Sequence, residues 1–272
     1  MSEITESSVL VVAHPDDEAL WFSSILGHVG RVVICFLDVA SRPDWSNGRR
    51  RAIAQLPISS VVTLALTESE AFNGANWRDP VPTEFGLEVS RRPEALSGIS
   101  IDRYHTNFSD LVAHLTETLR DCQNVITHNP WGEYGHEEHV QVYRAVCHVQ
   151  RALGYRIWFS NYCSNKSHNL MVRYLSGFDS SYLTMNTNID LARRVESVYR
   201  ANNCWTWPFS GYQWFRQECF VSNDSVVPSG MSVGRLFPLN YIRIEAPWDQ
   251  QQASGLRRRI GRIVHKVRDF SR

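Results

Sequence analysis

The stretch that decides the fold is Val9-Leu10-Val11-Val12-Ala13-His14-Pro15-Asp16-Asp17-Glu18. Its first half is short, apolar and rich in β-branched residues, without the alternation of a half-exposed strand. This pattern predicts a parallel strand over residues 9–13 that is buried on both faces. In an open α/β sheet, ligands bind in the crevice at the carboxyl ends of the strands. We therefore expect residues 14–18 to lie on the rim of such a crevice.

The polar half of this stretch contains the residue types of a metal site. His14 offers an imidazole nitrogen, and Asp17 offers a carboxylate on the same side of the next helix's first turn. Asp16, beside these two, is placed to take a proton from a metal-bound water. The alternative is purely structural, since proline followed by acidic residues favours a helix start. That alternative explains the acids but not His14.

A second motif follows another predicted strand at residues 125–127. It reads Trp131-Gly132-Glu133-Tyr134-Gly135-His136-Glu137-Glu138-His139. His136 and His139 are three residues apart, so they lie on one face of a helix. A catalytic zinc site has three protein ligands and one open position. His14 and Asp17 from the first motif, with either His136 or His139, would complete that set. The other histidine would then be an acid/base or charge-stabilising partner. Alternatively, the two histidines lie on a solvent-exposed helix face and bind no metal.

Together, residues 13–18 and 134–139 resemble the motifs of the PIG-L/LmbE-like zinc de-N-acetylases. The resemblance extends over residues 9–161. This family includes deacetylases of GlcNAc-phosphatidylinositol, of the GlcNAc-inositol precursor of mycothiol and of several antibiotics. The resemblance implies a zinc-dependent hydrolase that removes acetyl from an N-acetylated amino sugar, the sugar being part of a glycoside, a glycolipid or a small metabolite.

The resemblance also implies a role for each matching residue. The zinc ligands would be His14, Asp17 and His139. Asp16 would be the general base, and His136 would stabilise the oxyanion or act as an acid. Tyr134 matches a mobile active-site tyrosine of relatives. The second motif commonly reads HPDH in the family, so Glu137 and Glu138 are departures that leave both histidines in place.

Candidate substrate contacts come from several other segments. Relatives carry an Arg-x-x-Glu-Ala helix start where this chain has three consecutive arginines in an expected helix that opens at residues 47–48. The loop 67–102, rich in Pro, Gly, Asn and Ser, follows a strand and is expected to cover the site. The aromatic cluster at 205–215 suits apolar sugar faces, or alternatively closes the core. The candidates are Arg50, Glu68, Asp79, His128 and Trp207.

The chain has 272 residues, of which 43% are hydrophobic and 21% charged, as expected for one large globular domain. Strands and helices alternate through residue 160. This predicts an α/β fold, a Rossmann-like three-layer sandwich with a mainly parallel sheet, plus an aromatic-rich C-terminal elaboration within a single domain, 1–255. Zero net charge gives no field that favours nucleic acid.

Residues 256–272 have apolar residues at helical spacing with seven bases and one acid around them. A basic amphipathic C-terminal helix is typical of contact with an anionic membrane surface, but it can equally dock on its own domain or on a partner. The first residues lack a signal peptide's features, and no apolar run approaches the length of a membrane span. We therefore expect a cytoplasmic protein, for which peripheral contact with the inner membrane surface through residues 256–272 is one of these three alternatives.

Two other functions remain open. The same site chemistry would permit an amidase or deacylase acting on a peptide-like conjugate. A non-catalytic sugar-binding relative could keep the fold. Asp16 favours an enzyme, because a binding protein needs no base beside the metal.

Overall fold

The computed structural model describes residues 7–91, 98–174, 182–207, 211–223 and 237–244. The chain divides into two units, residues 1–242 and 243–272. The predicted domain limit at 255 and the predicted helix 256–272 lie outside the described residues, so both stay predictions, as does the cytoplasmic and membrane-surface location. Within the described part, no helix is long and apolar enough to cross a membrane.

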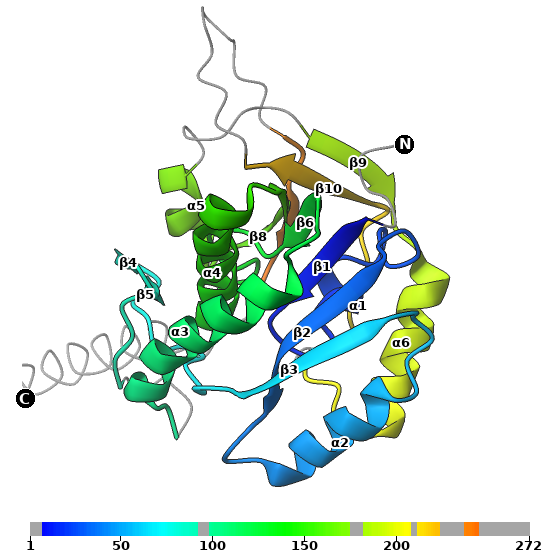
Figure 1. Cartoon of the computed structure of the whole chain (residues 1–272), viewed down its shortest axis with the longest axis horizontal. Coiled ribbons are helices and arrows are strands. Elements are labelled where there is room, and N and C mark those ends of the chain that lie inside the picture. The colour runs from blue at the N-terminus through cyan, green and yellow to red at the C-terminus, as the bar shows by residue number, and fades with distance from the viewer. Residues whose placement is uncertain (1–6, 92–97, 175–181, 208–210, 224–236, 245–272) are drawn as a thin grey trace, which may run out of the picture. The chain divides into compact units, whose positions relative to one another are not determined.

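A seven-stranded sheet forms the centre of the first unit (Figure 1). The strands are β1 (Ser8–Val12), β2 (Arg31–Asp38), β3 (Val61–Thr67), β6 (Asn124–Thr127), β7 (Arg156–Ser160), β9 (Tyr182–Asn186) and β10 (Gln217–Ser222). Their order is β3-β2-β1-β6-β7-β10-β9, and the first five run parallel. The other two are antiparallel to their neighbours. The predicted α/β fold with a mainly parallel sheet is confirmed, whereas its Rossmann-like detail and the aromatic-rich C-terminal elaboration stay predictions.

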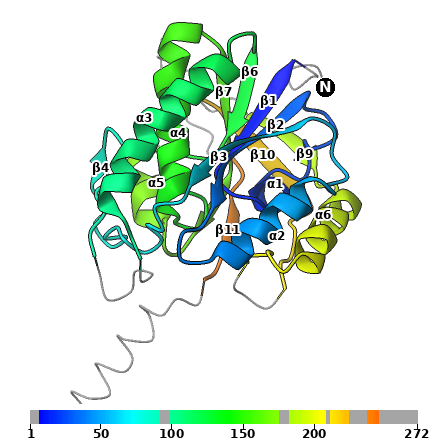
Figure 2. The same ribbon diagram turned by 60° about the horizontal axis from the view of Figure 1, so that its bottom comes forward.

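Helices cover both faces of the sheet. They are α1 (Asp17–Trp21), α2 (Pro43–Ile53), α3 (Ile101–Thr118), α4 (Glu137–Leu153), α5 (His168–Tyr174) and α6 (Ile189–Ala201). Figures 1 and 2 show α3 and α4 on one face and α2 and α6 on the other. In β1, Val9 and Val11 pack into the core with α3 and α4, while Leu10 and Val12 pack into the core with α6. This alternation is the two-residue period of a strand, and it explains why β1 is apolar throughout.

Two small sheets flank the large one. β8 (Tyr162–Ser164) pairs in parallel with β11 (Asn240–Ile242), and β4 (Pro82–Thr83) pairs with β5 (Gly86–Leu87) in a hairpin within the long loop after β3. The helix after this loop, α3, is capped by Ser100, whose side chain accepts the N–H of Arg103.

Two helix bounds differ from the sequence pattern. The apolar spacing over residues 19–29 suggests one helix, but α1 ends at Trp21. The next residues, Ser23 and Ser24, donate hydrogen bonds to the distant Glu218 carboxylate, and this long-range contact replaces a further helical turn. α2 begins at Pro43, four residues before the expected start, because proline fits the first turn of a helix.

The sheet brings the two sequence motifs together. β1 and β6 are neighbours, and the chain leaves β1 towards β2 on one side and β6 towards β7 on the other. The strand order therefore reverses between them, and ligands bind at such a switch point at the carboxyl ends of the strands. His14 follows β1, and the second motif follows β6.

Candidate metal centre

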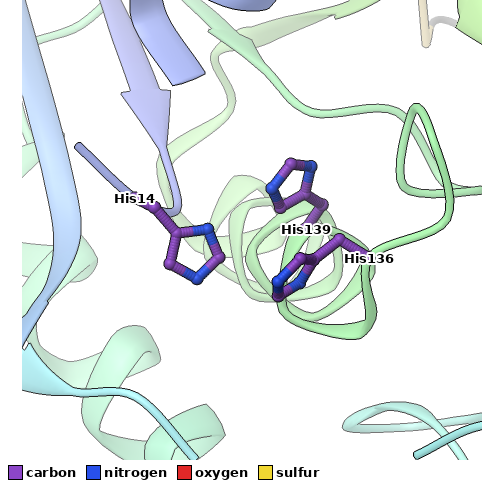
Figure 3. A group of neighbouring side chains, drawn as sticks. All are labelled: His14, His136 and His139. Carbon is purple, nitrogen blue, oxygen red and sulfur yellow. The ribbon is translucent and has the colours of Figure 1, made fainter. Parts of the chain in front are cut away.

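Three histidines, one after the end of β1 and two at the start of α4, point toward one another (Figure 3). His14 follows the end of β1, His136 is the N-cap of α4, and His139 lies in the first turn of that helix. All three are buried. Each offers a ring nitrogen, and these nitrogens lie within 4.8 Å of one another. The cluster thus has the spacing of a metal site.

The Asp17 carboxylate lies between two of these rings. Its Oδ2 is 3.3 Å from His14 Nδ1, and its Oδ1 is 3.3 Å from His139 Nε2. The backbone N–H of His14 and the indole N–H of Trp21 donate to the same carboxylate and fix its orientation. Neighbouring ligand atoms of a tetrahedral zinc ion are about 3.3 Å apart. Asp17 therefore lies at ligand spacing from both rings, and its carboxylate also forms a possible metal group with His128 and His139.

His139 carries the clearest sign of a missing partner. Its Nδ1 donates to Glu133 Oε2 at 2.8 Å, so the ring proton is on that nitrogen. Its Nε2 is buried and, among the described residues, makes no hydrogen bond. A buried nitrogen lone pair without a donor is costly. A metal ion held with Asp17 and His14 would satisfy it.

His136 has a different environment. Burial and the neighbouring His14 and His139 lower the pKa of His136 well below its usual range, so the ring is neutral. Its Nδ1 accepts the backbone N–H of Glu138 at 3.2 Å. The ring proton must then lie on Nε2, which makes this nitrogen a hydrogen-bond donor. Of the two histidines of α4, His136 therefore offers a donor nitrogen and His139 an acceptor nitrogen.

Asp16 lies at the N-terminus of α1 in a left-handed backbone conformation, with φ of 97°. Such strain costs about 1–3 kcal/mol and tends to cluster at functional sites. Burial and the charge of Asp17 raise the pKa of Asp16 to about 7, although two hydrogen bonds from Thr206 to Oδ2 oppose the shift. A carboxylate with a pKa near neutrality suits general-base catalysis.

A cavity of about 210 Å³ opens onto these side chains. Phe72, Tyr134 and Trp207 are among its aromatic lining residues. The Phe72 ring stacks on His136 with centroids 5.1 Å apart, and Tyr134 stacks on Trp21 at 5.5 Å. Burial raises the pKa of the Tyr134 phenol well above its usual range, so the phenol remains a neutral donor.

The structure places the sequence candidates for substrate contact in different surroundings. Glu68 and Trp207 line the cavity. Arg50 does not, because it pairs with the half-exposed Asp38. The neighbouring Arg49 lines the cavity instead and pairs with Glu68 at 2.5 Å. Its buried Nε makes no hydrogen bond to any residue that the structure describes. The sequence could have indicated Arg49, because it lies three residues before the buried Ala52 and therefore on the same face of α2.

Asp79 and His128 also lie outside the cavity lining. Asp79 is exposed and pairs with Arg173 at 2.6 Å. His128 is fully buried; its Nε2 accepts the N–H of Ala13 and its Nδ1 faces Glu133 at 3.0 Å. Although burial opposes protonation, the Glu133 carboxylate raises the pKa of His128 to about 9. The hydrogen bond from the N–H of Ala13, however, requires that Nε2 carry no proton. We therefore assign the neutral ring, which links the ends of β6 and β1.

Besides Arg49, three residues of the site were not identified as candidates from the sequence. Thr206 holds Asp16 from 190 residues away, and no local pattern indicates that contact. Glu138, a departure from the family motif, lies 2.9 Å from His14 Nε2 and accepts the N–H and hydroxyl of Ser69. Glu133 contacts two histidines at once. It stands within the second motif, but its side chain's direction depends on the loop conformation.

No family model matches the chain. It is similar to three curated proteins, each named 1D-myo-inositol 2-acetamido-2-deoxy-alpha-D-glucopyranoside deacetylase. Those from Salinispora arenicola and Streptomyces scabiei are each 27% identical, over 51% and 54% of this chain and 48% of their own lengths. That from Streptomyces griseus is 28% identical over 51% of this chain and 46% of its own length. The chain spans about half the length of these relatives.

Solved structures with a similar arrangement are also deacetylases by name. A deacetylase–teicoplanin complex from the teicoplanin biosynthesis pathway has 15% identity and a TM-score of 0.46, over 79% of this chain and 97% of that one. The A40926 pseudoaglycone deacetylase has 14% identity and a TM-score of 0.44, over 79% of this chain and 95% of that one.

Proposed function

We propose that this chain is a PIG-L/LmbE-like, zinc-dependent deacetylase that hydrolyses the acetamide of an N-acetylated amino sugar to acetate and a free amine. The observation that carries the proposal is the buried Nε2 of His139, which makes no hydrogen bond within the described part of the chain and lies beside Asp17 and His14. The names of the three curated relatives support the choice of an amino-sugar substrate.

His14, Asp17 and His139 would hold the zinc ion. When bound there, zinc supplies a Lewis acid and makes a water molecule acidic near neutral pH. Asp17 is prepared for this role, because its hydrogen bonds from His14 N–H and Trp21 keep both oxygens in place. These two N–H donors, one on each oxygen, favour the ionised form of the Asp17 carboxylate.

Asp16 is the general base in this proposal. Thr206 holds Asp16 through Oδ2, and we assign Oδ1 to proton transfer. An amide is a poor electrophile, so the attacking water must lose its proton as it approaches the carbonyl. The protonated carboxyl then returns the proton to the departing sugar amine.

His136 and Tyr134 stabilise the negative charge that develops on the carbonyl oxygen. The Nε2–H of a neutral His136 donates to the oxyanion, and a fixed donor of this kind contributes without reorganisation of solvent. The neutral phenol of Tyr134 can donate beside it. Phe72 excludes water from one side of His136.

The rest of the cavity binds the sugar. Trp207 offers an aromatic face to the apolar side of a sugar ring, and Arg49 with Glu68 offers groups for hydroxyls. We therefore propose Arg49 in place of Arg50 as the arginine that meets substrate.

The test is mass spectrometry of the purified protein with a panel of N-acetylhexosaminyl compounds and N-acylated peptides. We expect loss of one acetyl group from at least one sugar compound. Asp16→Asn should slow this loss by about 10²- to 10⁴-fold. The matched control Asp79→Asn, which changes an exposed carboxylate outside the cavity, should retain the original rate. Turnover of peptides alone would favour the amidase alternative, and zinc-dependent sugar binding without turnover would favour the non-catalytic one.

A further inference from the structure

Glu133 lies completely buried beneath the metal cluster, and both of its oxygens are occupied. Oε2 faces the Nδ1 atoms of His139 at 2.8 Å and His128 at 3.0 Å. Oε1 accepts the backbone N–H of Asn129 at 2.8 Å and the hydroxyl of Ser160 at 2.5 Å. Four donors thus satisfy one carboxylate, and the two on Oε1 keep Oε2 directed at the imidazoles.

The proton positions on both rings follow from these contacts. His128 accepts the N–H of Ala13 at Nε2, so its proton is on Nδ1. The His139 ring stacks on His128 with centroids 3.9 Å apart and an interplanar angle of 26°. Two parallel rings therefore donate to the same oxygen of Glu133. Rotation of the His139 ring would break its bond to that oxygen and lose the stacking on His128.

The backbone at Glu133 supports a specific role for its side chain. Its φ of 48° lies in the left-handed region, which a glycine adopts without strain and a glutamate does not. Burial of a carboxylate is a second cost, and pairing with hydrogen-bond donors offsets it. Burial opposes ionisation here, but the Nδ1–H donors of the two imidazoles lower the pKa of Glu133 and so favour the carboxylate. A glutamate at this position is favoured only where its carboxylate makes these bonds.

We propose that Glu133 is a positioning residue that fixes the His139 ring with its proton on Nδ1 and its Nε2 lone pair directed at the metal. Glu133 itself is not a ligand, because its oxygens are taken by the four donors. This inference rests on the metal site of the proposed function. Loss of a carboxylate that orients a metal-binding histidine typically weakens metal affinity by about 10- to 100-fold.

The first experiment measures zinc affinity of the full chain by competition with a chromophoric chelator. Glu133→Gln should bind zinc about 10- to 100-fold more weakly than the unmodified protein. The matched control is Glu218→Gln, which changes another fully buried carboxylate, whose donors are Ser23, Ser24 and Tyr162. The control should keep the original affinity. Equal zinc affinity of Glu133→Gln would overturn the inference, whereas absence of zinc binding by the unmodified protein would instead refute the proposed metal site.

A second measurement needs no variant and so does not depend on whether Glu133→Gln folds. Nitrogen-15 NMR of the zinc-free protein with labelled histidine reports which ring nitrogen carries the proton. We expect His139 and His128 to be protonated at Nδ1 and unprotonated at Nε2. A His139 ring with a proton on Nε2 and none on Nδ1 would overturn the inference, since Glu133 would then not be setting the tautomer.

Discussion

Gly48 is the point where α2 meets the C-terminal end of α6. A Cβ atom added to Gly48 would lie 2.5 Å from the backbone oxygen of Asn202 and 3.2 Å from Cβ of Cys204. In an open helix, replacing glycine by alanine stabilises a protein by about 1 kcal/mol. Here the new methyl group meets backbone that cannot rotate away, and such overpacking typically costs about 1–3 kcal/mol.

The steric cost exceeds the helix propensity gain, because a separation below 3.0 Å to backbone forces one of the helices to shift. After the gain of about 1 kcal/mol is subtracted from the cost of about 1–3 kcal/mol, we expect Gly48→Ala to lower the free energy of unfolding by up to about 2 kcal/mol, which lowers Tm by up to about 8 °C for a chain of this size. The matched control is Gly27→Ala. Its Cβ would have nothing within 4 Å, so its stability should be unchanged or raised by up to about 1 kcal/mol.

Urea unfolding followed by circular dichroism measures both variants against the unmodified protein. A Gly48→Ala protein as stable as the Gly27→Ala protein would refute the close packing of α2 against α6. The contact also bears on the cavity, because Arg49 follows Gly48 directly and Thr206 follows the end of α6. A shift of α2 should therefore raise KM more than it lowers kcat.

The other predictions concern the base, a buried carboxylate and the tail. Asp16→Asn should keep zinc while kcat falls by about 10²- to 10⁴-fold, and near-normal turnover would exclude Asp16 as the base. Burial raises the pKa of Glu218 above its unfolded value of 4.5, so its contribution to stability is lost as pH rises through the folded pKa. The glutamine of Glu218→Gln does not titrate, so this variant does not lose stability in that way. Thermal unfolding at increasing pH should therefore show the Tm of the variant rising relative to that of the unmodified protein. A Tm difference that stays constant with pH would contradict this prediction. If residues 256–272 bind an anionic membrane, sedimentation with anionic vesicles should fall with salt and vanish on their deletion, whereas equal sedimentation of the shortened chain would remove the idea.

The sequence was informative where chemistry and strand order coincide. His14 and Asp17 follow one apolar run, and His136 and His139 follow another. The carboxyl ends of parallel neighbouring strands meet at one edge of a sheet, so these side chains come together once the strand assignments are right. That reasoning requires no knowledge of long-range packing.

The sequence was uninformative where a contact depends on packing between distant segments. Thr206 reaches Asp16 across 190 residues, and its own neighbourhood carries no motif. The choice between Arg49 and Arg50 depends on which side of α2 faces the cavity. Because three arginines follow one another, that run alone does not indicate which of them lies on that side. The direction of Glu133 depends on a left-handed backbone angle that the sequence suggests for glycine, not for glutamate.

The most direct test of the metal site is the zinc content of purified protein without chelator, compared between two single variants of α4. The unmodified protein should contain one zinc ion. His139→Ala should lose it, because a proposed ligand atom, Nε2, is removed, whereas His136→Ala should retain zinc and lose turnover. Retention of zinc by His139→Ala together with its loss from His136→Ala, or no zinc in the unmodified protein even after zinc is added, would contradict the account.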